Sequence, residues 1–144
     1  MDRKHIRERK YFYCFFTGLM LLLLSGCSSL QQSRFSGDIQ NAAELYARGD
    51  FEDSLKANQN ILALSEGKPP GDQALFNIGL IYASNRYSKK DYRKSMAFFQ
   101  RVVKEYPRSQ LVPQSKTWIG VLEVIEKSKQ VDIEMERKKK KLVR

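Results

Sequence analysis

Few residues of this chain could carry out chemistry, and its two cysteines are the most informative of them. Cys27 directly follows a leucine-rich run, whereas Cys14 lies among aromatic residues inside the apolar stretch, where a thiol behaves as a small hydrophobe. A disulfide would require two residues of one apolar segment to meet, so we reject it. The lone histidine, His5, lies among the basic residues at the start of the sequence. If that segment is removed, no histidine remains, which excludes a Cys/His zinc site and a His-based triad. With no paired carboxylates in an apolar setting, we expect no catalytic residue, no metal site and no cofactor.

A basic segment and a short apolar stretch precede Cys27. The first ten residues include five Lys or Arg, and the apolar stretch over 11–24 is 14 residues long. A transmembrane helix needs about 20 apolar residues, so this stretch is short for a stable span. The order of basic, apolar and small residues is typical of a secretory signal peptide, which we predict over 1–26. An uncleaved N-terminal anchor is the alternative.

The quartet Leu24-Ser25-Gly26-Cys27 resembles the lipobox of bacterial lipoproteins. The resemblance implies that Cys27 is the first mature residue, with a diacylglycerol on its sulfur and an acyl chain on its amine. Several chains on one residue would anchor it firmly, because each buried CH₂ contributes about 0.8 kcal/mol. Ser28, rather than aspartate, is similar to lipoproteins sorted to the outer membrane. The resemblance therefore implies a lipid-anchored, periplasm-facing protein that meets no nucleic acid.

The segment after Cys27 is polar and shows no periodicity, so we predict a lipidated tether over 27–37. From Asp38 onward the apolar residues recur at helical spacing, and no segment alternates convincingly with a period of two. Five helices are expected: over 38–48, from Asp50 as a cap to Leu64, over about 72–84, from Asp91 as a cap to Tyr106, and from near Pro113. We predict an all-α chain of short antiparallel helix hairpins.

The stretch over 74–107 resembles a tetratricopeptide repeat. The residues at that family's positions are Ile78-Gly79, Tyr82, Tyr92, Ser95, Phe99, Val102 and Pro107. Four extra residues separate the two helices, as in the Sel1-like variant, so the repeat subtype stays open. The preceding hairpin resembles a degenerate repeat, with Gly49, Phe51 and Ser54 at matching positions and Asn58 at the aromatic position. The segment that begins near Pro113 resembles the first helix of a third, incomplete repeat. The resemblance implies stacked hairpins over 38–127, with Gly79 permitting close approach of two helices.

In tetratricopeptide arrays, positions on the first helix of a repeat bind extended or helical peptides. Carried over by register, these positions are Gln73, Phe76 and Leu80. Phe76 and Leu80 are apolar on a face that a stand-alone domain would keep polar. Two interpretations stay open, a peptide groove or packing beneath the N-terminal tether.

The C-terminal segment over 128–144 is strongly charged and is predicted to form a helical tail with a sparse apolar seam of Val131, Met135 and Leu142. It includes five consecutive basic residues: Arg137, Lys138, Lys139, Lys140 and Lys141. They could contact anionic lipid headgroups or an acidic partner. The alternative is a solvated terminus. The net charge of +10 does not distinguish these classes.

Together these features predict an envelope scaffold or adaptor that is not an enzyme and that binds a protein partner through a groove. The chain resembles in architecture the tetratricopeptide lipoproteins of Gram-negative envelopes, such as the one that serves outer-membrane β-barrel assembly. The alternative is a regulatory accessory of an envelope sensor kinase or secretion machine that acts through the basic tail.

Overall fold

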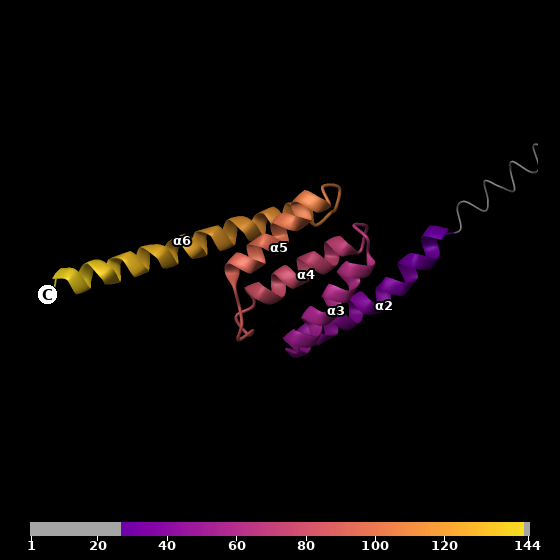
Figure 1. Cartoon of the computed structure of the whole chain (residues 1–144), viewed down its shortest axis with the longest axis horizontal. Coiled ribbons are helices and arrows are strands. Elements are labelled where there is room, and N and C mark those ends of the chain that lie inside the picture. The colour runs from indigo at the N-terminus through magenta and orange to yellow at the C-terminus, as the bar shows by residue number, and fades with distance from the viewer. Residues whose placement is uncertain (1–26, 143–144) are drawn as a thin grey trace, which may run out of the picture. The chain divides into compact units, whose positions relative to one another are not determined.

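The fold consists of helices joined by short loops throughout the part of the chain that the structure describes. The computed structural model describes the backbone of residues 27–142 and the side chains of residues 35–142 (Figure 1). Its helices are α2 (Cys27–Arg48), α3 (Phe51–Leu64), α4 (Gly71–Ala83), α5 (Tyr92–Glu105) and α6 (Val112–Leu142), and no strand occurs within these residues. The predicted all-α class is confirmed.

The predicted signal peptide over 1–26 and the side chain of Cys27 lie outside the described residues. Among residues 27–142, none of the helices combines the length and the apolar character that a membrane span requires. The prediction of lipid attachment at Cys27 therefore stays a prediction.

The segment expected to be an irregular tether is helical. We predicted that the first helix begins at Asp38, but α2 begins at Cys27 and continues through that residue to Arg48. The segment contains a single glycine, Gly37, and no proline, so polar composition alone does not interrupt the helix. A unit boundary nonetheless falls between Gly37 and Asp38, and the helices that pack together as hairpins belong to the unit from Asp38 onward.

Two aspartates stand at helix starts, and only one of them caps its helix. The side chain of Asp91 accepts hydrogen bonds from the backbone N–H groups of Arg93 and Lys94, both at 3.0 Å, as predicted for α5. Asp50 occupies the equivalent position before α3 but makes no capping hydrogen bond. Its carboxylate instead pairs with Arg48 at 3.2 Å, so Asp50 occupies the predicted cap position without forming the capping hydrogen bond.

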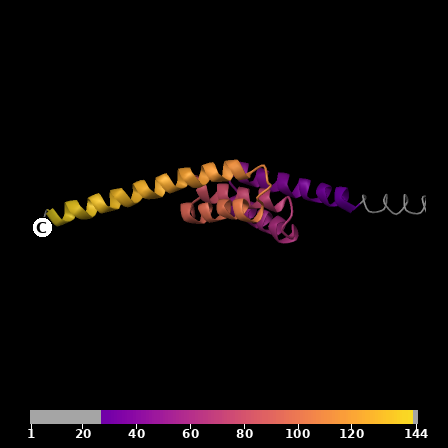
Figure 2. The same ribbon diagram turned by 90° about the horizontal axis from the view of Figure 1, so that it is seen from above.

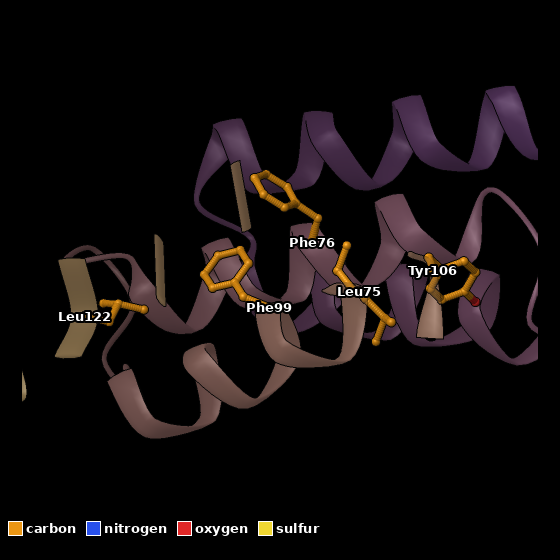
Figure 3. Packing of buried hydrophobic residues seen from close by; sticks show 6 residues of the cluster. Leu75, Phe76, Phe99, Tyr106 and Leu122 are labelled. Atoms are coloured by element: carbon orange, nitrogen blue, oxygen red, sulfur yellow. The ribbon is translucent and has the colours of Figure 1, made fainter. Parts of the chain in front are cut away.

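The helices stack in chain order, with α4 packing on α3, α5 on α4 and α6 on α5 (Figures 1 and 2). Because α4 is central, its two sides bury different residues. Ile78 and Ile81 join a cluster with Phe51, Leu55 and Tyr87. Leu75 and Phe76 join a second cluster whose other members come from α5, its C-terminal end and α6: Phe99, Val102, Tyr106 and Leu122 (Figure 3). Two continuous layers of apolar contacts thus hold the array together.

Beyond its contacts with α5, α6 continues as a single helix. Every residue from Lys127 to Leu142 is exposed, and the helix leaves the hairpins towards the C-terminus (Figure 1). The predicted helical tail is confirmed over 128–142.

Candidate protein-binding surface

The two hairpins share one internal contact that marks them as structural repeats. On α3 the buried hydroxyl of Ser54 donates a hydrogen bond to the carbonyl oxygen of Ala42 at 2.8 Å. On α5 the buried hydroxyl of Ser95 donates to the carbonyl oxygen of Gly79 at 2.7 Å. Both acceptors are small residues on the first helix, which allows the second helix to approach closely. The two contacts span 12 and 16 positions, and the difference is the four-residue insertion seen in the sequence.

Gly79 provides the closest helix approach in the second hairpin. A Cβ atom at this position would lie 2.8 Å from two ring carbons of Phe99. The Phe99 ring is fully buried, meets Phe76 edge-on at 5.2 Å and stacks on Trp118 at 5.9 Å between ring centroids. The prediction that Gly79 permits close packing is confirmed, and α4, α5 and α6 meet around this one ring.

The three residues predicted to bind a partner have different surroundings. Gln73 is exposed, Leu80 is half-buried against the second cluster, and Phe76 is only 5% exposed. The Phe76 ring therefore belongs to the packed interior in this structure, because it contacts Phe99 from the neighbouring helix. Asn77, which the sequence reasoning did not select, is partly exposed and lies one turn after Gln73 on the same face as Leu80.

A polar pair that the sequence reasoning missed joins the two repeats. The amide of Asn77 on α4 donates to the side-chain oxygen of Asn58 on α3 at 3.1 Å, and Asn58 in turn donates to the backbone carbonyl of Ser54 at 2.8 Å. Asn58 is completely buried at the position where the second repeat has Phe99. A buried amide needs such partners. The available signal in the sequence was an asparagine at an aromatic position, because the buried side-chain amide of Asn58 needs hydrogen-bond partners and the adjacent helix can provide one.

The four-residue insertion brings the loop between α4 and α5 onto the first hairpin. Arg86 donates to the carbonyl oxygen of Ala47 at 3.4 Å and lies over the ring of Phe51 at 5.6 Å. Glu52 accepts hydrogen bonds from the hydroxyl of Tyr87 at 3.0 Å and from the ammonium of Lys89 at 2.6 Å. The loop is therefore fixed against α3.

The charges around Glu52 shift three pKa values. The hydrogen bond from Lys89, and then that from Tyr87, lower the pKa of Glu52. The hydrogen bond to Glu52 raises the pKa of Lys89. Burial, and then the hydrogen bond to Glu52, raise the pKa of Tyr87 to about 12. The cluster is therefore in its paired state at neutral pH and acts as a structural clamp.

The basic run is solvent-exposed at the end of α6. All five of its side chains, from Arg137 to Lys141, are exposed, and Lys139 forms an ion pair with Glu136 at 3.5 Å. The run lies far along the helix from its contacts with α5, which end near Glu126, the residue that accepts from Arg93 at 3.1 Å. Within the described residues, the groove positions and the basic run thus belong to different surfaces. No group of three or more potential metal ligands occurs among those residues.

Comparison with known protein families identifies the second hairpin. The family model described as Tetratricopeptide repeat matches residues 73–109, which contain α5 and all of α4 except its first two residues. The second hairpin is thus similar to a tetratricopeptide repeat. The first hairpin makes the same serine contact as the second, and α6 stacks on α5. The described helices therefore form an all-α tetratricopeptide-like array, an architecture that serves as a scaffold for protein–protein interaction. Neither a curated protein nor a solved structure matches the chain.

Proposed function

We propose that the chain is a lipid-anchored scaffold of the bacterial cell envelope that binds a protein partner through the first-helix face of its central repeat. The resemblance of residues 24–27 to a lipobox supports the anchor, and Ser28 favours the outer membrane with the array facing the periplasm. The repeat match supports the binding of a protein. No chemical step is assigned to the chain.

The observation that carries the binding proposal is the composition of one face of α4. Gln73, Asn77 and Leu80 lie at positions i, i+4 and i+7, and none of the three is buried. Side-chain amides both donate and accept hydrogen bonds, so they can pair with the main chain of an extended peptide. A half-buried leucine beside them supplies apolar contact area. Phe76, which lies within the packed core, supports this face from beneath.

Site-specific photocrosslinking from intact envelopes tests this surface. We expect a photoreactive side chain at Gln73 to capture one defined partner protein, and the same group at Lys104 to capture none of it. Both positions are exposed, but Lys104 lies on α5, the second helix of the repeat, which makes it a matched control. Leu80→Glu should abolish the adduct formed from Gln73 without unfolding the chain. Equal capture from both positions would reject the first-helix face as the binding surface.

The anchor is tested separately by palmitate labelling of the full chain and of Cys27→Ala. We expect label in the first and none in the second, and we expect the unlabelled variant to leave the membrane fraction. Equal labelling of the two would contradict lipid attachment at Cys27. Separation of inner and outer membranes then tests the sorting suggested by Ser28.

A regulatory role of the basic tail is the second candidate, and it rests on the exposure of the run from Arg137 to Lys141. Replacement of these five residues by glutamine keeps good helix formers while it removes five positive charges. Loss of function in this variant, with Leu80→Glu silent, would favour regulation through the tail over the scaffold surface.

A further inference from the structure

The long helix α6 has an apolar seam on the side that faces away from the hairpins. Its members recur at alternating spacings of three and four, and they are Val121, Val124, Ser128, Val131, Met135, Lys138 and Leu142, which we call the α6 seam. This spacing is a heptad repeat over three heptads, the pattern of two helices that wind around each other. In heptad notation the a positions are at 121, 128, 135 and 142, and the d positions are at 124, 131 and 138.

The seam is not used for packing within the described chain. Its five apolar members are between 45% and 86% exposed, whereas Leu122, one residue after the first of them, is 1% exposed. A row of apolar side chains along one exposed face is unfavourable in water. The segment of α6 over 128–142 is exposed throughout, so no tertiary contact buries it. An isolated helix as short as this segment is only marginally stable in water. The seam thus has the exposure of an interface whose partner is missing.

We propose that the α6 seam pairs with the same seam of a second copy of this chain, in a parallel, in-register coiled coil over 121–142. The charges beside the seam select this occupant. In such a pair each g position faces the e′ position of the following heptad in the other helix. Lys127 then faces Asp132 of the second copy, and Glu134 faces Lys139 of the second copy. Both contacts join opposite charges, and the twofold symmetry repeats each of them.

The packing of α6 on α5 leaves room for this partner. Within 121–142, Leu122 and Glu126 contact α5, and they occupy b and f positions on the opposite side of the helix from the seam. Trp118, which stacks on Phe99 of α5, precedes the seam. The hairpins therefore lie on the outer side of each helix, and the second copy can approach along the seam without displacing α5. The exposed ion pair between Lys139 and Glu136 is easily exchanged for a contact with Glu134 of the second copy, because such pairs contribute little.

Two seam positions are polar, which sets the character of the dimer. Ser128 occupies an a position, and Lys138 occupies a d position where its aliphatic stem can lie along the seam while the ammonium reaches water. Polar residues at such positions reduce stability while they specify the register. We therefore expect a reversible dimer. The proposal does not depend on the function proposed for α4 or on lipid attachment at Cys27.

Cysteine crosslinking of the full chain in intact cells tests the orientation. Val124→Cys and Val131→Cys place thiols at d positions, and Glu123→Cys and Gln130→Cys place them one residue earlier, at exposed positions outside the seam. Mild oxidation should link the two seam variants into disulfide dimers, and the two control variants should give only the background that the parent chain gives. In an antiparallel pair, at most one position along the seam lies opposite the same position of the second copy, so at most one of the two seam variants could form a disulfide. Dimer formation at only one seam position, equal yields at seam and control positions, or no dimers would each overturn the proposal.

Charge exchange in the Val131→Cys background tests the choice of a second copy. Lys127→Glu or Asp132→Lys alone places like charges together twice and should lower dimer association about tenfold. The double exchange should restore dimer formation, and so should mixing the two single variants, whose unlike charges then meet. Failure of the double exchange to restore the yield would overturn the assigned pairing. Far-UV circular dichroism of each purified variant checks that helix content is unchanged, so that loss of dimers reports the pairing.

Discussion

Gly79→Ala tests the close helix approach that organises the array. The added Cβ would lie 2.8 Å from two carbons of the Phe99 ring, whereas optimal carbon contacts lie at about 3.5–4.0 Å. The ring must therefore move by roughly 0.7 Å or more. It is fully buried and meets Phe76 on one side and Trp118 on another, so the movement disturbs three helices.

The expected magnitude follows from two opposing effects. Overpacking a dense core costs about 1–3 kcal/mol. Replacing a glycine by alanine within a helix contributes about 1 kcal/mol in the other direction. We expect Gly79→Ala to lower the free energy of unfolding by about 1 kcal/mol. Urea unfolding followed by the fluorescence of Trp118, the only tryptophan and a direct neighbour of Phe99, measures the change.

Gly120→Ala is the matched control for this prediction. Gly120 is exposed on α6, and a Cβ there meets nothing within 4 Å, so we expect a gain of about 1 kcal/mol from helix propensity alone. The additional substitution Phe99→Leu should relieve the clash at Gly79, so that the two changes cost less together than the sum of their separate costs. Stabilisation by Gly79→Ala equal to that by Gly120→Ala would refute the reasoning.

Three further predictions concern individual contacts. Ser95→Ala should destabilise the chain by about 1 kcal/mol in the same urea assay, because a buried hydrogen bond between α5 and α4 is lost. Asp91→Ala should cost about 1 kcal/mol through loss of a helix cap, and Asp50→Ala should cost clearly less, because Asp50 makes no such bond; equal costs would contradict this assignment. The folded chain holds the proton of the Tyr87 hydroxyl more tightly than the unfolded chain does. The contribution of this difference to the free energy of unfolding is therefore complete below pH 10 and is lost as the pH rises towards about 12. Tyr87→Phe should flatten the decline of stability over that range, and an unchanged profile would exclude the raised pKa of Tyr87 as its cause.

Local signals predicted most of the fold. The periodic apolar positions and the cap at Asp91 located α3 to α6 closely, and the same residues carried the resemblance to a tetratricopeptide repeat, because their spacing directly reflects which face of a helix is buried. The start of α2 was predicted less well. The polar segment before Asp38 has no row of apolar residues at helical spacing, so its sequence does not indicate a helix. Polar residues nonetheless form a helix where glycine and proline are rare.

The candidate site was only partly predictable, because burial depends on neighbours that the sequence does not place. Register put Gln73, Phe76 and Leu80 on the first helix, but only the packing of α5 decides that the ring of Phe76 meets Phe99. Asn58 at an aromatic position indicates a buried amide, but no local pattern identifies its partner Asn77, because the two residues lie on different hairpins. The contacts of Glu52 with the inserted loop are also nonlocal.

The way in which the array ends explains why the exposed seam occurs on α6. The second hairpin is held on both sides: α3 and α6 flank it, and its inserted loop is fixed to the first hairpin through Glu52 and Phe51. Within the described residues, α6 has no second helix of its own to cover its outer side. A terminal helix that caps a repeat array presents a polar outer face. The outer face of α6 instead carries Val121, Val124 and Val131, so this helix has the character of an interface, and the charges at Lys127 and Asp132 select a second copy of the same helix to cover it.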